Sequence, residues 1–180
     1  MDSWKKEETE ALGDYHVFSL RRDRSRSPHT GQAHEFFVLE APDWINVIPL
    51  TPVGEVVLIR QYRHGVGEVM LEIPGGMLDE GEDDPLAAAA RELREETGYE
   101  AAELALIGVS TPNPAILDNR LYSYLARDVR LVAAPQFDSR EYIEVELVPL
   151  EQIPGLIRSG RISHALVIAA FFHLEHYLTQ

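Results

Sequence analysis

Three glutamates, Glu92, Glu95 and Glu96, lie within five consecutive residues and carry the clearest chemistry in the chain. On a helix that turns about 100° per residue, Glu92 and Glu96 share one side and Glu95 lies beside them. Like charges at this spacing destabilise an isolated helix unless something compensates them. Carboxylate oxygens are the ligands that Mg²⁺ and Mn²⁺ prefer, so the cluster predicts a divalent-cation site. A solvated acidic face is the alternative interpretation.

A glycine pair and a second acidic run precede the three glutamates. Gly75 and Gly76 stop a predicted strand, and they are followed by Asp79-Glu80-Gly81-Glu82-Asp83-Asp84. Asp84 is a good N-cap and Gly98 is placed to end a helix, so the spacing predicts a helix over 84–97. Four apolar residues within it share one arc and predict its buried face: Leu86, Ala89, Ala90 and Leu93.

Strands must position this helix. Apolar and alternating segments predict strands over 15–20, 35–39, 44–50, 55–60, 69–73, 105–109, 121–126 and 143–148. The polar stretch 21–34 is expected to be a hairpin tip or a loop. Ser163 is expected to cap a helix that begins at Ala165. Because strands dominate around one central and one or two late helices, we expect a mixed α/β (α+β) domain.

Composition excludes several classes of protein. The 180 residues suit one domain, and 16 basic against 30 acidic residues give a formal charge of −14. Binding to long nucleic acids requires many Lys and Arg contacts to phosphate, so we expect no nucleic-acid partner. The chain has no cysteine and no long apolar run. Thiolate sites are therefore excluded, and we expect a cytoplasmic protein without a membrane partner.

The segment 76–99 resembles the signature of the Nudix hydrolases. That signature is Gly, five residues, Glu, seven residues, then Arg-Glu-apolar-x-Glu-Glu-x-Gly-apolar. Here five residues separate Gly76 from Glu82, and eight rather than seven precede Arg91-Glu92-Leu93-Arg94-Glu95-Glu96-Thr97-Gly98-Tyr99. We place the additional residue at Asp83 or Asp84, where it lengthens a loop and leaves the helix register unchanged.

Neighbouring segments extend the resemblance to one branch of the family. Residues 57–63 and 71–76 are similar to strands that precede the box in enzymes that cleave ADP-ribose and nucleotide sugars. The resemblance implies an α/β/α sandwich with a mixed β-sheet and an N-terminal antiparallel strand extension. It implies a single Nudix domain over 1–180, with 46–180 as catalytic core and 1–45 as N-terminal strands that could form a homodimer.

The resemblance also implies an activity and its residues. The activity is Mg²⁺- or Mn²⁺-dependent hydrolysis of the pyrophosphate bond in a nucleoside diphosphate sugar, which yields a nucleoside monophosphate and a sugar phosphate. The implied metal ligands are Glu92, Glu95, Glu96 and the Gly75 carbonyl. The candidate general bases lie in a later acidic loop, Glu141 first and then Asp138, and Glu95 is a further catalytic carboxylate.

Two further sets of residues complete the implied site. The structural residues of the box are Gly76, Glu82, Arg91 and Gly98, and Arg91 would orient a glutamate. The residues placed around the substrate are Arg63, Glu72, Arg60, Asn113 and Trp44. For Arg63, an exposed surface arginine is the alternative interpretation, and for Trp44 it is a core aromatic.

The choice of substrate stays open among nucleotide sugars. ADP-ribose enzymes tend to carry Pro-Gly and then an acidic residue where this chain has Pro114-Ala115 and Asn119. The difference favours GDP-mannose or UDP-glucose beside ADP-ribose. Alternatives are a coenzyme A or nucleoside triphosphate pyrophosphatase of the same family and a non-catalytic nucleotide-sugar-binding module. An isomerase of the same fold is disfavoured because the chain lacks the cysteine that such an enzyme would use.

Overall fold

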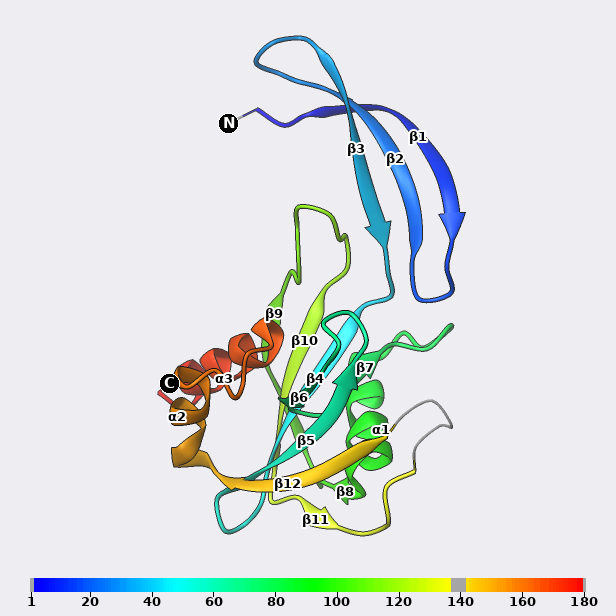
Figure 1. The fold of residues 1–180 in the computed structure, drawn as a ribbon. Coiled ribbons are helices and arrows are strands. Elements are labelled where there is room, and N and C mark those ends of the chain that lie inside the picture. The colour runs from blue at the N-terminus through cyan, green and yellow to red at the C-terminus, as the bar shows by residue number, and fades with distance from the viewer. Residues whose placement is uncertain (1, 137–141, 180) are drawn as a thin grey trace. The chain divides into compact units, whose positions relative to one another are not determined.

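The computed structural model describes residues 2–136 and 142–179 (Figure 1). The chain divides into two compact units. One comprises Met1–Pro42 and Thr111–Arg120, and the other comprises Asp43–Ser110 and Leu121–Gln180. That the whole chain acts as one Nudix domain stays a prediction. No helix in the described part of the chain has both the length and the apolar character that a membrane span needs.

The first unit contains a three-stranded antiparallel sheet in the order β1 (Lys5–Asp14), β2 (Ser19–Arg26) and β3 (Ala33–Glu40). This confirms the N-terminal antiparallel extension. The loop expected over 21–34 is wrong for residues 21–26, which belong to β2, and for residues 33–34, which belong to β3. The strand is stabilised by cross-strand charge pairs instead of apolar alternation: Arg22 pairs with Glu10, and Arg26 pairs with Glu7 at 2.7 Å.

The second unit is built on a seven-stranded sheet. Its main path runs β12 (Ile143–Pro149), β5 (Glu55–Arg63), β4 (Trp44–Leu50), β10 (Leu121–Arg127) and β9 (Leu104–Ser110). The strand β6 (Glu68–Glu72) pairs with β5, and β7 (Gly75–Met77) pairs with β4. Among the described strands of this sheet only β4 and β10 pair in parallel, so the sheet is mixed as expected. A separate ribbon joins β8 (Tyr99–Glu100) to β11 (Arg130–Leu131).

Alternating side chains of the sheet bury two apolar layers. Val47 on β4 and Val57 on β5 pack in the layer that includes Ala89 and Leu93 of α1 (Pro85–Thr97). Ile48 and Leu58 lie in the other layer, which includes Phe171 and Leu174 of α3 (Ala165–Leu178). The short α2 (Ile153–Arg158), preceded by a 3₁₀ turn at Leu150–Gln152, joins the second layer (Figure 1). The expected α/β/α sandwich is confirmed for this unit.

The central helix has the predicted ends but a partly different buried face. The side chain of Asp84 accepts a hydrogen bond from the Leu86 amide at 2.9 Å, and Gly98 closes the helix with a φ of 74°. Leu86 is 43% exposed and Ala90 is also exposed, so the predicted stripe was wrong at both positions. The buried side instead continues from Ala89 and Leu93 to Glu96 and Thr97, which turns one acidic residue inward.

Helix α3 begins at Ala165 as predicted, but its capping residue differs from the prediction. Ser163 is not the capping residue. His164 occupies the N-cap position, and its side chain makes no capping hydrogen bond. The His164 carbonyl accepts hydrogen bonds from the amides of Val167 and Ile168, both at 3.1 Å.

Candidate functional site

The glycine pair of β7 brings the backbone against the acidic side of α1. A Cβ at Gly76 would collide with the Glu92 carboxylate, and one at Gly75 would collide with the Ile45 carbonyl on β4. The Gly75 amide donates a hydrogen bond to Glu96 Oε2 at 2.9 Å. At Gly75 the obstacle is the β4 backbone, so glycine is required there, whereas a side chain at Gly76 would force the end of the Glu92 side chain to move.

Arg91 lies at the centre of the acidic residues. Its Nη1 donates to Glu92 Oε1 at 2.9 Å and to Glu95 Oε2 at 3.0 Å, and its Nη2 donates to Glu82 Oε2 at 3.1 Å. Burial by itself would lower the pKa of Arg91, but the hydrogen bond to Glu82 and the charge of Glu92 raise it well above its usual range. Arg91 thus stays charged and orients three carboxylates.

The additional residue in the box lies in the loop before α1. Asp84 caps the helix, and Glu82 still reaches Arg91 across the lengthened loop. The Asp79 amide also donates to Glu82 at 3.1 Å. The hydrogen bond from Arg91, followed by the one from Asp79, holds the pKa of Glu82 below its ordinary value. Helix register and the Glu82–Arg91 contact are therefore both compatible with the insertion.

The oxygen donors beside β7 are of the chemical type that a hard divalent cation prefers. Glu96 is only 4% exposed and bonds to the Gly75 amide, while Glu92 lies against Gly76. All the predicted ligands are oxygens, which suits Mg²⁺ or Mn²⁺. Within residues 2–136 and 142–179, however, no three acidic or histidine side chains are gathered closely enough to enclose an ion. Arg91 instead neutralises Glu92 and Glu95, so a bound cation would have to replace part of that neutralisation.

The two candidate bases cannot be placed. Glu141 and Asp138 both lie outside the described residues. Neighbouring Tyr142 is described and highly exposed, and its hydroxyl donates to Glu144 Oε1 at 3.2 Å.

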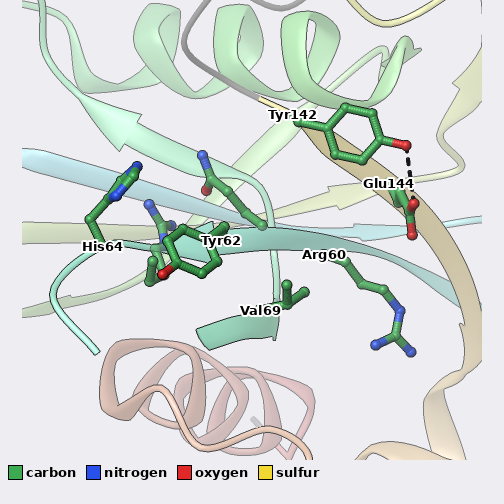
Figure 2. A pocket seen from close by; sticks show the side chains of 8 residues that line it. Arg60, Tyr62, His64, Val69, Tyr142 and Glu144 are labelled. Carbon is green, nitrogen blue, oxygen red and sulfur yellow. Dashed lines mark hydrogen bonds between the residues drawn. The ribbon is translucent and has the colours of Figure 1, made fainter. Parts of the chain in front are cut away.

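A cavity of about 580 Å³ opens beside β5. The described residues that line it are Arg60, Gln61, Tyr62, Arg63, His64, Val69, Tyr142 and Glu144. Figure 2 shows Arg60 on β5 and Glu144 on β12 with the ring of Tyr142 above them. Arg60 forms an ion pair with Glu146 of β12. The cavity therefore offers two arginines and several aromatic rings, a lining suited to an anionic ligand with a flat or sugar-like part.

Glu72 is a buried acid that holds Arg63 at this cavity. Arg63 donates from Nε to Glu72 Oε1 at 3.0 Å and from Nη2 to Oε2 at 2.8 Å. His164 Nδ1 lies 3.0 Å from Oε2. Burial alone would raise the pKa of Glu72, but the hydrogen bonds from His164 and Arg63 outweigh it and lower the pKa to about 2. His164 was not among the predicted residues, because nothing in its local sequence distinguishes it from the other histidines.

Stability should depend on the ionised form of Glu72. The folded-state pKa is depressed from 4.5 to about 2, so the stabilisation is complete above the unfolded-state value and is lost as pH falls between the two. A shift of this size corresponds to about 3 kcal/mol at most. We expect the difference in unfolding free energy between wild type and Glu72→Gln, measured by urea denaturation, to shrink from pH 7 to pH 3. A difference that does not change with pH would contradict the assignment.

Trp44 and Asn113 are the two other residues predicted to contact the substrate. Trp44 begins β4, where it pairs with Met77 and Leu121, and it does not line the cavity; its buried Nε1 has no hydrogen-bond partner among the described residues. Asn113 belongs to the other compact unit, where its carbonyl accepts bonds from the amides of Ile116 and Leu117. The structure thus gathers the box residues at β7 and α1 and the two arginines at the cavity, while Trp44 lies on β4 next to β7 and is not part of the cavity lining.

Comparison with known proteins gives consistent matches. The NUDIX domain matches residues 40–171. An ADP-ribose pyrophosphatase of Bacillus subtilis is 30% identical over 146 residues, which cover 81% of this chain and 78% of that protein. One from Mycobacterium tuberculosis is 30% identical over 89% of this chain and 78% of its own length. A methanol dehydrogenase activator of Bacillus methanolicus is 29% identical, covering 93% of this chain and 90% of that protein.

A solved structure shares the fold. A crystal structure described as an ADP compounds hydrolase superposes with a TM-score of 0.87, covering 99% of this chain and 96% of the other. Sequence identity is 20%, so this likeness bears on the fold alone.

Proposed function

Since this chain belongs to the NUDIX domain family, we propose that it hydrolyses the pyrophosphate bond of nucleoside diphosphate sugars, ADP-ribose among them. The products are a nucleoside monophosphate and a sugar phosphate. The observation that carries the proposal is the contact of Glu92 and Glu96 of α1 with Gly76 and Gly75 of β7. It is supported by similarity to two ADP-ribose pyrophosphatases over four fifths or more of this chain.

The proposed cofactor is Mg²⁺, or Mn²⁺ in its place. Glu92, Glu95 and Glu96 would hold it together with the Gly75 carbonyl. The ion would neutralise charge on the diphosphate, which otherwise repels an incoming nucleophile. Arg91 keeps the carboxylates oriented through its bonds to Glu92 and Glu95.

The proposed general base is Glu141, and Asp138 is the second candidate. Removing the proton of the attacking water requires a carboxylate that is not occupied by the metal. We expect Glu141→Gln to lower turnover without weakening metal binding. If Glu141→Gln has no effect on turnover and Asp138→Asn does, Asp138 takes the role.

Arg63 and Arg60 are proposed to bind the substrate. Arg63 is held by a buried carboxylate yet remains 38% exposed at the side chain, and both arginines line the cavity. A guanidinium held rigidly in this way suits a phosphate oxygen or a sugar hydroxyl. The volume of about 580 Å³ is within the usual range for a small-molecule site.

We also propose that the protein is a homodimer formed through the N-terminal sheet. Trp4, Phe36 and Phe37 are large apolar side chains, each 42–51% exposed, and the rings of Trp4 and Phe36 lie 5.2 Å apart. The outer strand β1 has one unpaired edge within the described sheet, and the outer edge of β3 forms an isolated bridge to Leu117 at Leu39. Exposed edges and aromatic side chains favour association with another chain. Sedimentation equilibrium should give twice the chain mass, and a monomer at high concentration would refute the proposal.

The substrate class can be tested with a panel of diphosphates. Phosphate release with added phosphatase is measured for ADP-ribose, GDP-mannose, UDP-glucose, coenzyme A and deoxynucleoside triphosphates. We expect one or more nucleotide sugars to be turned over at least about tenfold faster than the rest, the discrimination that about 1.4 kcal/mol of differential transition-state binding gives. Preference for coenzyme A or a triphosphate would overturn the substrate assignment while retaining the family.

A further inference from the structure

His164 stands at the N-cap of a fourteen-residue helix without acting as its cap. The N-cap position favours Ser, Thr, Asp or Asn, whose side chains accept hydrogen bonds from the first helical amides. The His164 side chain makes no such bond. Its Nδ1 instead lies 3.0 Å from Glu72 Oε2 on β6. A local preference that is set aside for a specific long-range contact is typical of a residue with another role.

The contact links α3 to the arginine of the cavity through a single oxygen. Glu72 Oε2 receives both His164 Nδ1 and Arg63 Nη2, the latter at 2.8 Å, while Oε1 receives Arg63 Nε at 3.0 Å. The Glu72 side chain is 2% exposed, whereas those of Arg63 and His164 are 38% and 34% exposed. The buried carboxylate therefore fixes the plane of a guanidinium that reaches the cavity, and His164 restrains the carboxylate at the oxygen that also receives Arg63 Nη2.

We propose that His164 is a positioning residue for substrate binding, which through Glu72 holds the Arg63 guanidinium in the orientation that meets a phosphate of the substrate. The inference rests on the proposed function, because it takes Arg63 as a substrate-binding group. The bond requires a proton on Nδ1, which the Nδ1–H neutral form and the imidazolium both supply. Both oxygens of Glu72 also accept hydrogen bonds from Arg63. The loss of His164 therefore loosens the Glu72–Arg63 ion pair without removing it.

Three substitutions separate the role of Nδ1 from the bulk of the ring. The amide nitrogen of Asn reaches close to the position of Nδ1, that of Gln reaches toward Nε2, and Ala removes both. We expect His164→Ala and His164→Gln to raise KM for ADP-ribose about tenfold, the effect of losing one hydrogen bond to a charged group. The value of kcat should change less than about twofold, because Arg63 binds ground and transition state alike. His164→Asn should restore a KM close to that of wild type.

A double-mutant cycle with Arg63→Ala distinguishes positioning from a general structural role. If His164 acts through Arg63, then His164→Ala should not raise KM further once Arg63 is gone. An equal rise in both backgrounds would overturn the inference, as would a wild-type KM in His164→Ala.

A second measurement keeps the inference separate from the proposed function. The Arg63 Nε–H resonance, assigned by its loss in Arg63→Lys, reports the bond to Glu72 in ligand-free protein. It should shift or broaden in His164→Ala and remain in place in His164→Asn. If wild type hydrolyses no nucleotide sugar, the proposed function fails, whereas an unchanged Arg63 resonance in His164→Ala refutes the positioning role itself.

Discussion

Glu96→Gln should lower the turnover of a nucleoside diphosphate sugar by on the order of 10³-fold or more and leave the fold essentially intact. Glu96 is buried, and its Oε2 accepts the Gly75 amide. Glutamine has nearly the same shape and keeps an oxygen that can accept that hydrogen bond. The substitution therefore removes the negative charge that the metal needs and little else.

Circular dichroism and urea denaturation establish the fold of the variant, and titration calorimetry with Mg²⁺ measures its metal affinity. Glu103→Gln is the matched control, because Glu103 is an exposed glutamate just beyond α1 and β8. It should retain wild-type turnover. A small loss of rate in Glu96→Gln with unchanged metal affinity would remove Glu96 from the set of metal ligands.

Gly76→Ala is expected to have the second largest effect, a fall in turnover on the order of 10²-fold, as when a small misplacement disturbs a catalytic arrangement. The added Cβ would occupy space that the Glu92 carboxylate fills. Either Glu92 moves away from β7, or β7 moves away from α1 and weakens the hydrogen bond between the Gly75 amide and Glu96. We expect turnover to fall together with Mg²⁺ affinity.

Gly155→Ala is the control for adding a methyl group. Gly155 lies in α2, and the nearest contact of an added Cβ would be the end of the Arg158 side chain at 4.0 Å. This variant should match wild type in turnover and be as stable or slightly more stable, since alanine favours a helix. Full activity of Gly76→Ala would show that Glu92 need not lie against β7 during the reaction.

The fold was predictable where local patterns determine it. The caps Asp84 and Gly98 fix the ends of α1 from adjacent residues, and β4 and β5 are recognisable as apolar runs. The strand β2 was missed from Arg21 onward because most of its residues there are charged, and its stability comes from partners on another strand such as Glu10 and Glu7. Such pairing depends on register, which a single segment does not reveal.

The contacts of the site were likewise predictable where the residues are close in sequence and not where they are distant. Helical spacing brings Arg91, Glu92 and Glu95 together, so their contacts follow from the sequence. The contact of Glu72 with His164 joins residues 92 positions apart and depends on how α3 packs on the sheet. Ser163 was preferred as the cap on propensity alone; the helix does begin at Ala165, but His164 occupies the N-cap position and its side chain contacts Glu72.

The central claim is that the residues at β7 and α1 hydrolyse a diphosphate with the help of a divalent cation. The most direct test follows the turnover of ADP-ribose by one preparation of wild-type protein, first with Mg²⁺, then after chelation, and finally after Mg²⁺ is restored. The account predicts turnover that disappears with chelator and returns with the metal. Turnover that persists in fully chelated protein, or a folded protein that binds Mg²⁺ and hydrolyses no nucleotide sugar, would contradict it.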